Sequence, residues 1–314
     1  MTDLEKIKNL EEIIGVKLNK KKFLKKPDIL NEDRLYDEVT SDYVLDSEDN
    51  LIGLSIRNIP LHNCYFVKDF KKLEMLDLTR NKMTDISSVK ELQNLIKLDL
   101  GYNQISDISS LKELKNITHL ALNHNEIWDI SLIKEYKNLV HVNLANNTIS
   151  DISPLKDLKK LTEIYFGSSI ISDISPLKDL KNLIKLDLSF NRIVDISILK
   201  ELTKLKHLNL YFNGISDISS LKELKNLIKL NFSVNQISDI SPLKELKKLT
   251  SLSLKRNKIK DLPVWITDFD MEIITEEDGD GINLYKNSIE SPPYEIVKQG
   301  KEAIKKWFEE KTKK

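Results

Sequence analysis

The chain has 314 residues, of which 49 are Lys or Arg and 49 are Asp or Glu, so its formal net charge is zero. A protein without net charge is not attracted electrostatically as a whole to nucleic acid or to an anionic membrane, and we expect neither as a partner. The single cysteine, Cys64, excludes an internal disulfide framework and a multi-cysteine zinc site, and we expect its side chain to be a small buried apolar group.

The first 50 residues have the composition of an N-terminal cap. Residues 1–8 interleave charged with apolar residues and lack the apolar run of a signal peptide or membrane span, so we expect a soluble, cytoplasmic protein. Apolar residues between Leu4 and Ile14 follow helical spacing, whereas residues 43–46 and 51–54 flank a polar turn and predict a hairpin. The basic residues between Lys17 and Lys26 are balanced by nearby acids, so a solvated cap is favoured over phosphate contacts.

A period of twenty-two residues governs the segment 51–262, and a fixed period of this length is the signature of a solenoid. Each unit begins L-x-x-L-x-L, and the alternating end of this pattern predicts a short strand with one buried face. We expect one such strand per unit, stacked in parallel. Both ends of a solenoid expose core and need caps, which residues 1–50 and 263–314 can supply.

Asparagine recurs eight residues into most units, and it predicts an internal ladder. Its side chain carries both a donor and acceptors, so it can satisfy backbone groups that the curved chain buries. The column runs Asn81, Asn103, Asn125, Asn147, Asn191, Asn213, Asn235 and Asn257, and Ser169 interrupts it. We expect the turn at Ser169 to be a weak point.

The motif Asp-Ile-Ser follows in the units up to Asp239 and predicts the start of a short helical turn on the convex side. Nine equivalent aspartates, from Asp85 to Asp261, suit a turn-capping role better than a ligand row, because a binding site seldom needs nine copies of one residue. Where the order is Ser153-Pro154, we expect serine at the N-cap and proline at the first helical position.

The run of residues 208–221, Leu-Asn-Leu-Tyr-Phe-Asn-Gly-Ile-Ser-Asp-Ile-Ser-Ser-Leu, resembles an internalin-type bacterial leucine-rich repeat, and the likeness covers roughly residues 51–262. The resemblance implies an α/β fold: a right-handed leucine-rich-repeat solenoid with a parallel β-sheet on the concave face and short 3-10 or α turns on the convex face. Internalins that engage host receptors are exported by a signal peptide and are often held at the wall by a sorting motif. Neither signal is visible here.

The C-terminal segment, residues 263–314, is predicted to hold an insertion, a terminal repeat and a helical cap. The repeat pattern returns at Ile282 after an eight-residue insertion between Trp265 and Asp278, and apolar positions from Ile296 to Phe308 predict one amphipathic helix. Residues 278–300 resemble the end of the repeat region in bacterial Roco-type proteins, where a GTPase domain follows. No G-x-x-x-x-G-K-[ST] phosphate loop is present in this chain.

Candidates for metal binding and catalysis are weak. His119 and His141 occupy one column, with Glu163 next in it, but a metal site needs three or four matched ligands. The acidic stretch 276–280 lacks the spacing of a calcium loop. No histidine has a recognisable nucleophile or oxyanion hole beside it, so we expect no metal, no cofactor and no enzymatic activity.

Specificity in a repeat protein must lie in columns that vary between units. One column places Phe190, Phe212 and Val234 on three consecutive predicted strands, with Tyr102 and His124 earlier in the same column. Neighbouring columns add Tyr211 and Tyr165. Exposed aromatic clusters resemble the composition of protein interfaces, so we expect these seven residues to bind a partner.

The sequence therefore predicts a monomeric, non-catalytic protein–protein interaction scaffold or regulatory binding module that uses its concave face. Its partner would be a protein, and it could act like the repeat region of a Roco GTPase working from a separate chain. The alternative is a host-directed, internalin-like binding protein or effector exported by a route that the sequence does not reveal.

Overall fold

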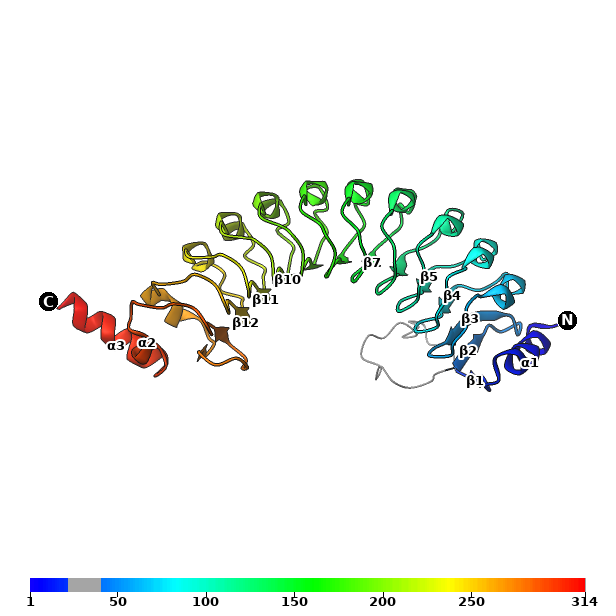
Figure 1. Ribbon diagram of the computed structural model, residues 1–314, viewed down its shortest axis with the longest axis horizontal. Coiled ribbons are helices and arrows are strands. Elements are labelled where there is room, and N and C mark those ends of the chain that lie inside the picture. The colour runs from blue at the N-terminus through cyan, green and yellow to red at the C-terminus, as the bar shows by residue number, and fades with distance from the viewer. Residues whose placement is uncertain (22–40, 314) are drawn as a thin grey trace. The chain divides into compact units, whose positions relative to one another are not determined.

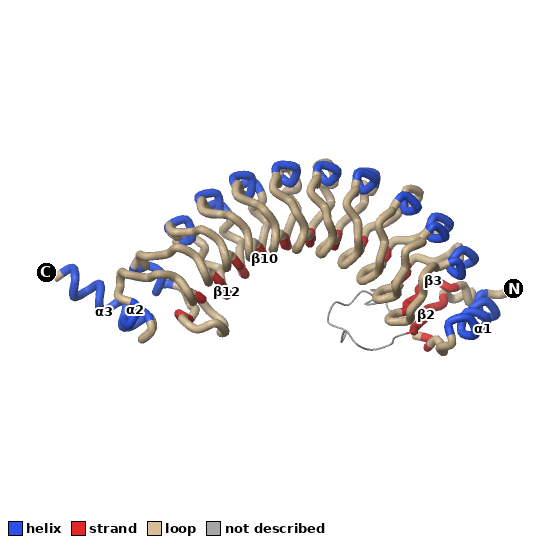
Figure 2. The backbone as a smooth tube through the Cα atoms, in the orientation of Figure 1, coloured by secondary structure: helices blue, strands red, loops and turns tan. Residues whose placement is uncertain are grey.

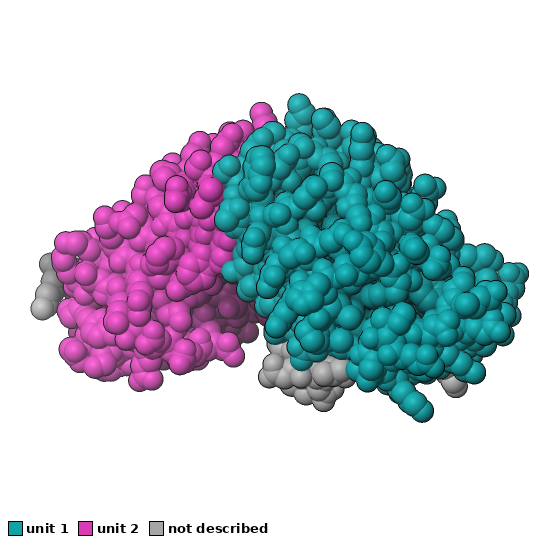
Figure 3. All heavy atoms as spheres, turned by 45° about the vertical axis from the view of Figure 1, so that its right-hand side comes forward, with its two compact units in different colours: residues 1–161 teal, residues 162–314 magenta. Residues whose placement is uncertain are grey.

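The computed structural model describes residues 1–21 and 41–313, and most of the basic and acidic segment between Lys17 and Asp37 lies outside them. The chain folds into two compact units, residues 1–161 and residues 162–314 (Figure 3). In each unit the strands line the inner, concave side and the helical turns line the outer side (Figures 1 and 2).

The first unit begins with a helix and an antiparallel strand pair. Helix α1, Asp3–Ile14, starts with a capping box in which Thr2 and Glu5 each bind the other's backbone N–H. Strand β1, Asn19–Lys20, pairs in parallel with β2, Ser41–Leu45, which runs antiparallel to β3, Leu51–Ile56. The predicted helix and hairpin are therefore present, and the hairpin leads directly into the repeats.

The rest of the first unit repeats one strand and one convex turn. From β3 onward the strands pair in parallel, and each residue lies opposite the residue twenty-two positions later, as Met75 does with Lys97. The strands are β4 Met75–Asp77, β5 Lys97–Asp99, β6 His119–Ala121 and β7 His141–Asn143. The 3-10 turns are Tyr65–Asp69, Ser87–Glu91, Ser109–Leu111, Ser131–Glu135 and Ser153–Leu155.

The second unit continues the same repeat. Its strands are β8 Glu163–Tyr165, β9 Lys185–Asp187, β10 His207–Asn209, β11 Lys229–Asn231, β12 Ser251–Ser253, β13 Ile273–Ile274 and β14 Ile282–Asn283. Its 3-10 turns are Ser175–Leu177, Ser197–Glu201, Ser219–Glu223, Ser241–Leu243 and Val264–Asp268. All of its strand pairs are parallel. The predicted fold class, a right-handed solenoid of leucine-rich repeats, is confirmed.

The asparagine ladder lies inside the solenoid as predicted. Asn103 donates its amide to the carbonyl oxygens of Leu78 and Leu100, and its oxygen accepts from the N–H groups of Asn81 and Met83. These bonds satisfy backbone groups of two successive repeats, where the chain leaves the strand and has no ladder partner. The side chain of Asn103 is only 9% exposed, which fixes the register of the repeat.

The recurring aspartates cap the convex turns. In each of eight repeats the carboxylate accepts the N–H of the serine two residues later, as Asp151 does from Ser153 at 2.8 Å. The predicted serine N-cap is wrong, because Ser153 is already the first residue of its turn and its hydroxyl donates back to Asp151. Aspartate provides the cap since its side chain reaches the free N–H across an Asx turn.

The C-terminal end differs from the prediction in two ways. The insertion forms strand β13, which pairs with β14, while β14 pairs with β12 and continues the sheet. The predicted single helix is two helices, α2 Tyr294–Val297 and α3 Lys301–Thr312. Gly300 separates them with a φ of 87°, a backbone conformation that ends the helical path. Trp307, on α3, is half-buried.

Candidate functional site

The variable column that contains Phe190 lies just after the strands and not on them, which corrects the sequence prediction. Every residue of this column has a left-handed backbone, with φ between 52° and 59°. The column comprises Asn58, Arg80, Tyr102, His124, Asn146, Ser168, Phe190, Phe212, Val234, Arg256 and Lys286. The left-handed residue turns the chain so that the next position, the ladder asparagine in most repeats, points inward.

This conformation is unfavourable for most residues in the column. A left-handed backbone costs an L-residue other than glycine roughly 1–2 kcal/mol, and bulky or β-branched residues such as phenylalanine and valine adopt it least readily. Asn146 is the residue type that tolerates it best. The aromatic and branched residues elsewhere in the column therefore lower the stability of the fold relative to asparagine at the same positions.

Phe190, Tyr211 and Phe212 form one contiguous cluster in the second unit, which we call the aromatic ridge. Phe190 stacks on Phe212 with ring centroids 5.3 Å apart and meets Tyr211 edge-on at 4.7 Å. The side chains of Phe190 and Phe212 remain 45% and 50% exposed. The ridge is held by backbone bonds between turns, from Phe190 N to Tyr211 O at 2.8 Å and from Phe212 N to Ser233 O at 2.9 Å.

Val234 follows in the same column but has no ring to extend the stack. It is half-buried, and its carbonyl accepts the N–H of Asn213 at 3.3 Å. Val194, an exposed residue on the loop that leads to the convex turn, enlarges the apolar surface near the ridge, because Gly214 leaves room for its methyl group. Sequence reasoning missed Val194, although serine fills that position in most repeats and the deviation could have signalled it.

Tyr102 and His124 belong to the first unit, where they form a separate stack. Their rings lie 3.9 Å apart at an angle of 14°, and the guanidinium of Arg80 lies 4.2 Å from the centroid of Tyr102. Burial, and then the charge of Arg80, lowers the pKa of His124. Arg80 was not among the predicted site residues, and its chemistry makes the stack cationic at one end.

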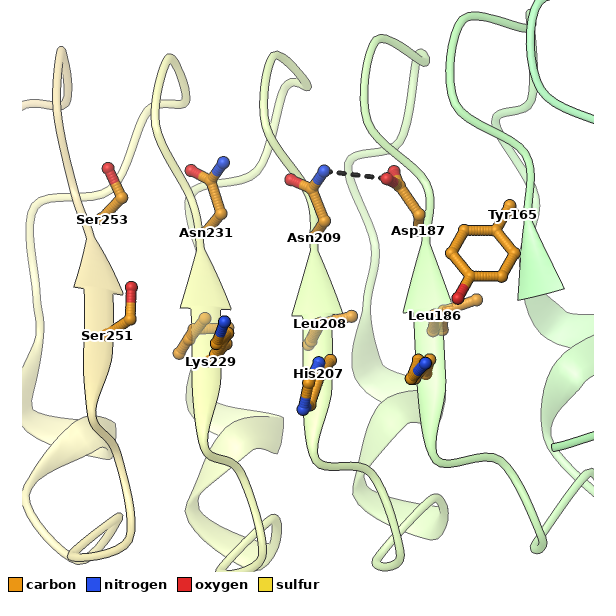
Figure 4. A pocket seen from close by; sticks show the side chains of 12 residues that line it. Tyr165, Leu186, Asp187, His207, Leu208, Asn209, Lys229, Asn231, Ser251 and Ser253 are labelled. Carbon is orange, nitrogen blue, oxygen red and sulfur yellow. Dashed lines mark hydrogen bonds between the residues drawn. The ribbon is translucent and has the colours of Figure 1, made fainter. Parts of the chain in front are cut away.

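A shallow concave groove of about 430 Å³ crosses the strands of the second unit (Figure 4). Strand pairing aligns its side chains in two rows: Lys185, His207, Lys229 and Ser251 in one, and Asp187, Asn209, Asn231 and Ser253 in the other. Tyr165, another predicted site residue, lines this groove and not the ridge. Its hydroxyl donates to Glu163 at 3.0 Å.

Lys185 and Asp187, at the β8–β10 end of the groove, both have side-chain partners. Lys185 forms an ion pair with Glu163 at 3.2 Å, and Asp187 accepts the amide of Asn209 at 2.9 Å. Asp187 also accepts the backbone N–H of Ser189, so it shapes the turn after its strand. Lys185 and Asp187 thus have structural roles. Burial, followed by the charges of Lys185 and Lys229, lowers the pKa of His207.

His119 and His141 lie opposite each other on β6 and β7, with their rings stacked 5.8 Å apart. Within residues 1–21 and 41–313, no group of three or more His, Cys, Asp or Glu side chains is placed to hold a metal ion. In the same part of the chain, none of the helices is long and apolar enough to cross a membrane.

The fold and the repeated core define a class of protein in which the same core residues recur in each repeat and the exposed surface residues vary. The family model for leucine-rich repeats in two copies matches residues 93–135, 137–179, 181–223 and 225–267, together more than half of the chain. The chain therefore belongs to the leucine-rich-repeat proteins. Repeats of this fold typically serve as protein–protein interaction modules. No curated protein sequence matches the chain significantly.

Solved structures place it near bacterial members of this family. An internalin, inlF, from Listeria monocytogenes is 29% identical, with a TM-score of 0.64 over 77% of this chain and 78% of that one. A leucine-rich-repeat protein from Leptospira interrogans shares the fold at 23% identity, with a TM-score of 0.68 over 89% of this chain and 69% of that one. The plant peptide hormone receptor RGFR1, solved in complex with RGF2, shares the fold at 15% identity, with a TM-score of 0.59 over 78% and 44%.

Proposed function

We propose that this chain is a non-catalytic protein-binding scaffold or regulatory module, and that the aromatic ridge is the centre of its contact with a protein partner. The observation that carries the proposal is the ridge itself, two half-exposed phenylalanines held in a left-handed conformation that disfavours them. Aromatic residues are enriched among the residues that dominate binding energy at protein interfaces. A rigid, exposed, pre-formed ridge needs little ordering on binding.

The test compares the double variant Phe190→Ala, Phe212→Ala with the wild-type chain. Alanine keeps the strain of the left-handed position and removes only the rings, so the fold should persist with a small change in melting temperature. Binding to partners identified by pull-down and mass spectrometry should weaken by at least about 2 kcal/mol, roughly 30-fold in Kd.

Trp128→Ala is the matched control, because Trp128 is another exposed aromatic side chain, 68% exposed, outside the ridge. It should leave the Kd for those partners unchanged. Equal capture of the same partners by wild type and double variant would contradict the proposal, and unfolding of the double variant would show that the rings are structural.

A finer proposal concerns the cellular role. The resemblance of residues 278–300 to the end of the Roco repeat region supports a monomeric cytoplasmic regulator of a separate GTPase. The likeness to the Listeria monocytogenes internalin supports the alternative, a host-directed binding protein that leaves the cell. Fractionation of the source cells separates these roles, because a regulator stays with the cytoplasmic fraction and an exported protein appears in the medium or at the surface.

A further inference from the structure

The β11–β12 end of the concave groove differs chemically from its other end. Lys229 is exposed and has no ion-pair partner within the described residues. The amide oxygen of Asn231 accepts the N–H of Ser233 at 3.0 Å, so its NH₂ group is left for the groove. The hydroxyl of Ser251 lies in the same row as Lys229, one strand further on (Figure 4).

These groups are mostly hydrogen-bond donors. An ammonium group and an amide NH₂ can only donate, and a serine hydroxyl can donate or accept. Adjacent strands lie about 4.8 Å apart, so the side chains of one row are neighbours. His207 is the next member of the row on the other side of Lys229. Such a convergence of donors around one unpaired cation suits an anionic oxygen acceptor.

Backbone hydrogen bonds connect the ridge to the residues that follow the groove. The Asn209 side chain in the groove accepts the N–H of Tyr211 at 3.2 Å, and the Phe212 turn is bonded to Ser233. Asn209 and Phe212 are three residues apart in the chain, and three residues of extended peptide span about 10 Å. One ligand can therefore contact both.

We propose that the partner presents an extended acidic segment, with a carboxylate bound by Lys229, Asn231 and Ser251 and an aromatic or large apolar side chain packed on the aromatic ridge. This inference rests on the proposed function and names the chemistry of its partner. The surroundings of His207 agree with it, since burial, and then the charges of Lys185 and Lys229, lower the pKa of this histidine. A carboxylate bound there would offset that field and raise the pKa of His207.

The probe is a displayed library of random twelve-residue peptides, selected against the whole chain. The wild-type protein should enrich peptides that combine Asp or Glu with an aromatic residue. Lys229→Glu should lose the enrichment of acidic residues and weaken binding of a selected acidic peptide at least tenfold. Lys222→Glu, the same charge change on the exposed convex turn Ser219–Glu223, is the matched control and should bind like wild type.

The double variant Phe190→Ala, Phe212→Ala separates this inference from the proposed function. It should lose the aromatic preference and keep a weakened acidic one. If the wild type selects aromatic peptides without acidic residues, the ridge binds and the carboxylate site is wrong. The background level of enrichment is measured with a variant that combines Lys229→Glu with Phe190→Ala and Phe212→Ala. If the wild type enriches no peptide above this background, both proposals fail for peptide ligands. Binding of a single-stranded oligonucleotide instead of acidic peptides, abolished by Lys229→Glu, would overturn the assignment to a protein partner.

Discussion

The interruption of the asparagine ladder at Ser169 provides a sharp test of how the repeats are stabilised. The hydroxyl oxygen of Ser169 is buried and has no hydrogen-bond partner among residues 1–21 and 41–313. In the following repeat Asn191 donates to the carbonyls of Phe166, Leu188 and Ser189 at 2.9–3.1 Å and accepts the N–H of Ile171. The carbonyl of Leu188 also accepts from Asn213, so two ladder amides converge on it.

We expect Ser169→Asn to raise the free energy of unfolding. By analogy with Asn191, an asparagine here would donate to the carbonyls of Phe166 and Gly167 within its own repeat. Each such bond contributes about 0.5–1.5 kcal/mol net. Ordering a longer side chain offsets part of this gain. A net increase of about 1–2 kcal/mol remains.

The reverse change, Asn191→Ser, is the matched control and should lower the free energy of unfolding by about 2–3 kcal/mol, because it leaves buried backbone groups unbonded. Urea unfolding followed by circular dichroism measures both variants against the wild type. The expected order of midpoints is Ser169→Asn above wild type and Asn191→Ser below it. A lower midpoint for Ser169→Asn, together with a neutral Asn191→Ser, would refute the ladder as a stabilising device.

Three further predictions concern the core, the charges and the cysteine. Leu188→Ala removes a fully buried side chain between stacked strands and should cost about 2–5 kcal/mol in the same unfolding assay; a loss below about 1 kcal/mol would contradict its place in the core. Burial, and then the neighbouring carboxylate of Asp77, raises the pKa of Asp99 from 3.8 to about 7, so its ionisation removes stability as the pH rises from about 4 through 7. The equivalent position two repeats later holds Asn143, so asparagine suits this place in the repeat. Asp99→Asn should be more stable than wild type at pH 8 and nearly equal to it at pH 4. Identical pH profiles of unfolding for the two proteins would refute this. Cys64 is fully buried and burial raises the pKa of its thiol to about 12, so a thiol reagent should label it only after unfolding; fast labelling of the native protein would disprove this.

The sequence alone determined the repeat, the strands and the core. A leucine at a fixed place in every unit must bury itself in the same way each time, since each repeat contacts mainly its neighbours. The asparagine and aspartate columns could be assigned for the same reason. The twenty-two-residue period ends after Leu262, and the sequence prediction was less accurate from there on. It missed strand β13 in the insertion and the division of the C-terminal helix into two.

Only the tertiary structure decided how the variable surface is arranged. The sequence grouped Phe190, Tyr211 and Phe212 correctly as neighbours, but placed the phenylalanines on strands instead of in left-handed turns. Residues of many types adopt the left-handed backbone in this column, so the composition of the column does not reveal it. Lys185 pairs with Glu163, whereas Lys229 in the same row has no ion-pair partner in the described part of the chain. This difference likewise depends on which side chains meet across strands. Repetition reveals the groups that every unit needs, whereas the contacts that distinguish one unit from another exist only after the units have stacked.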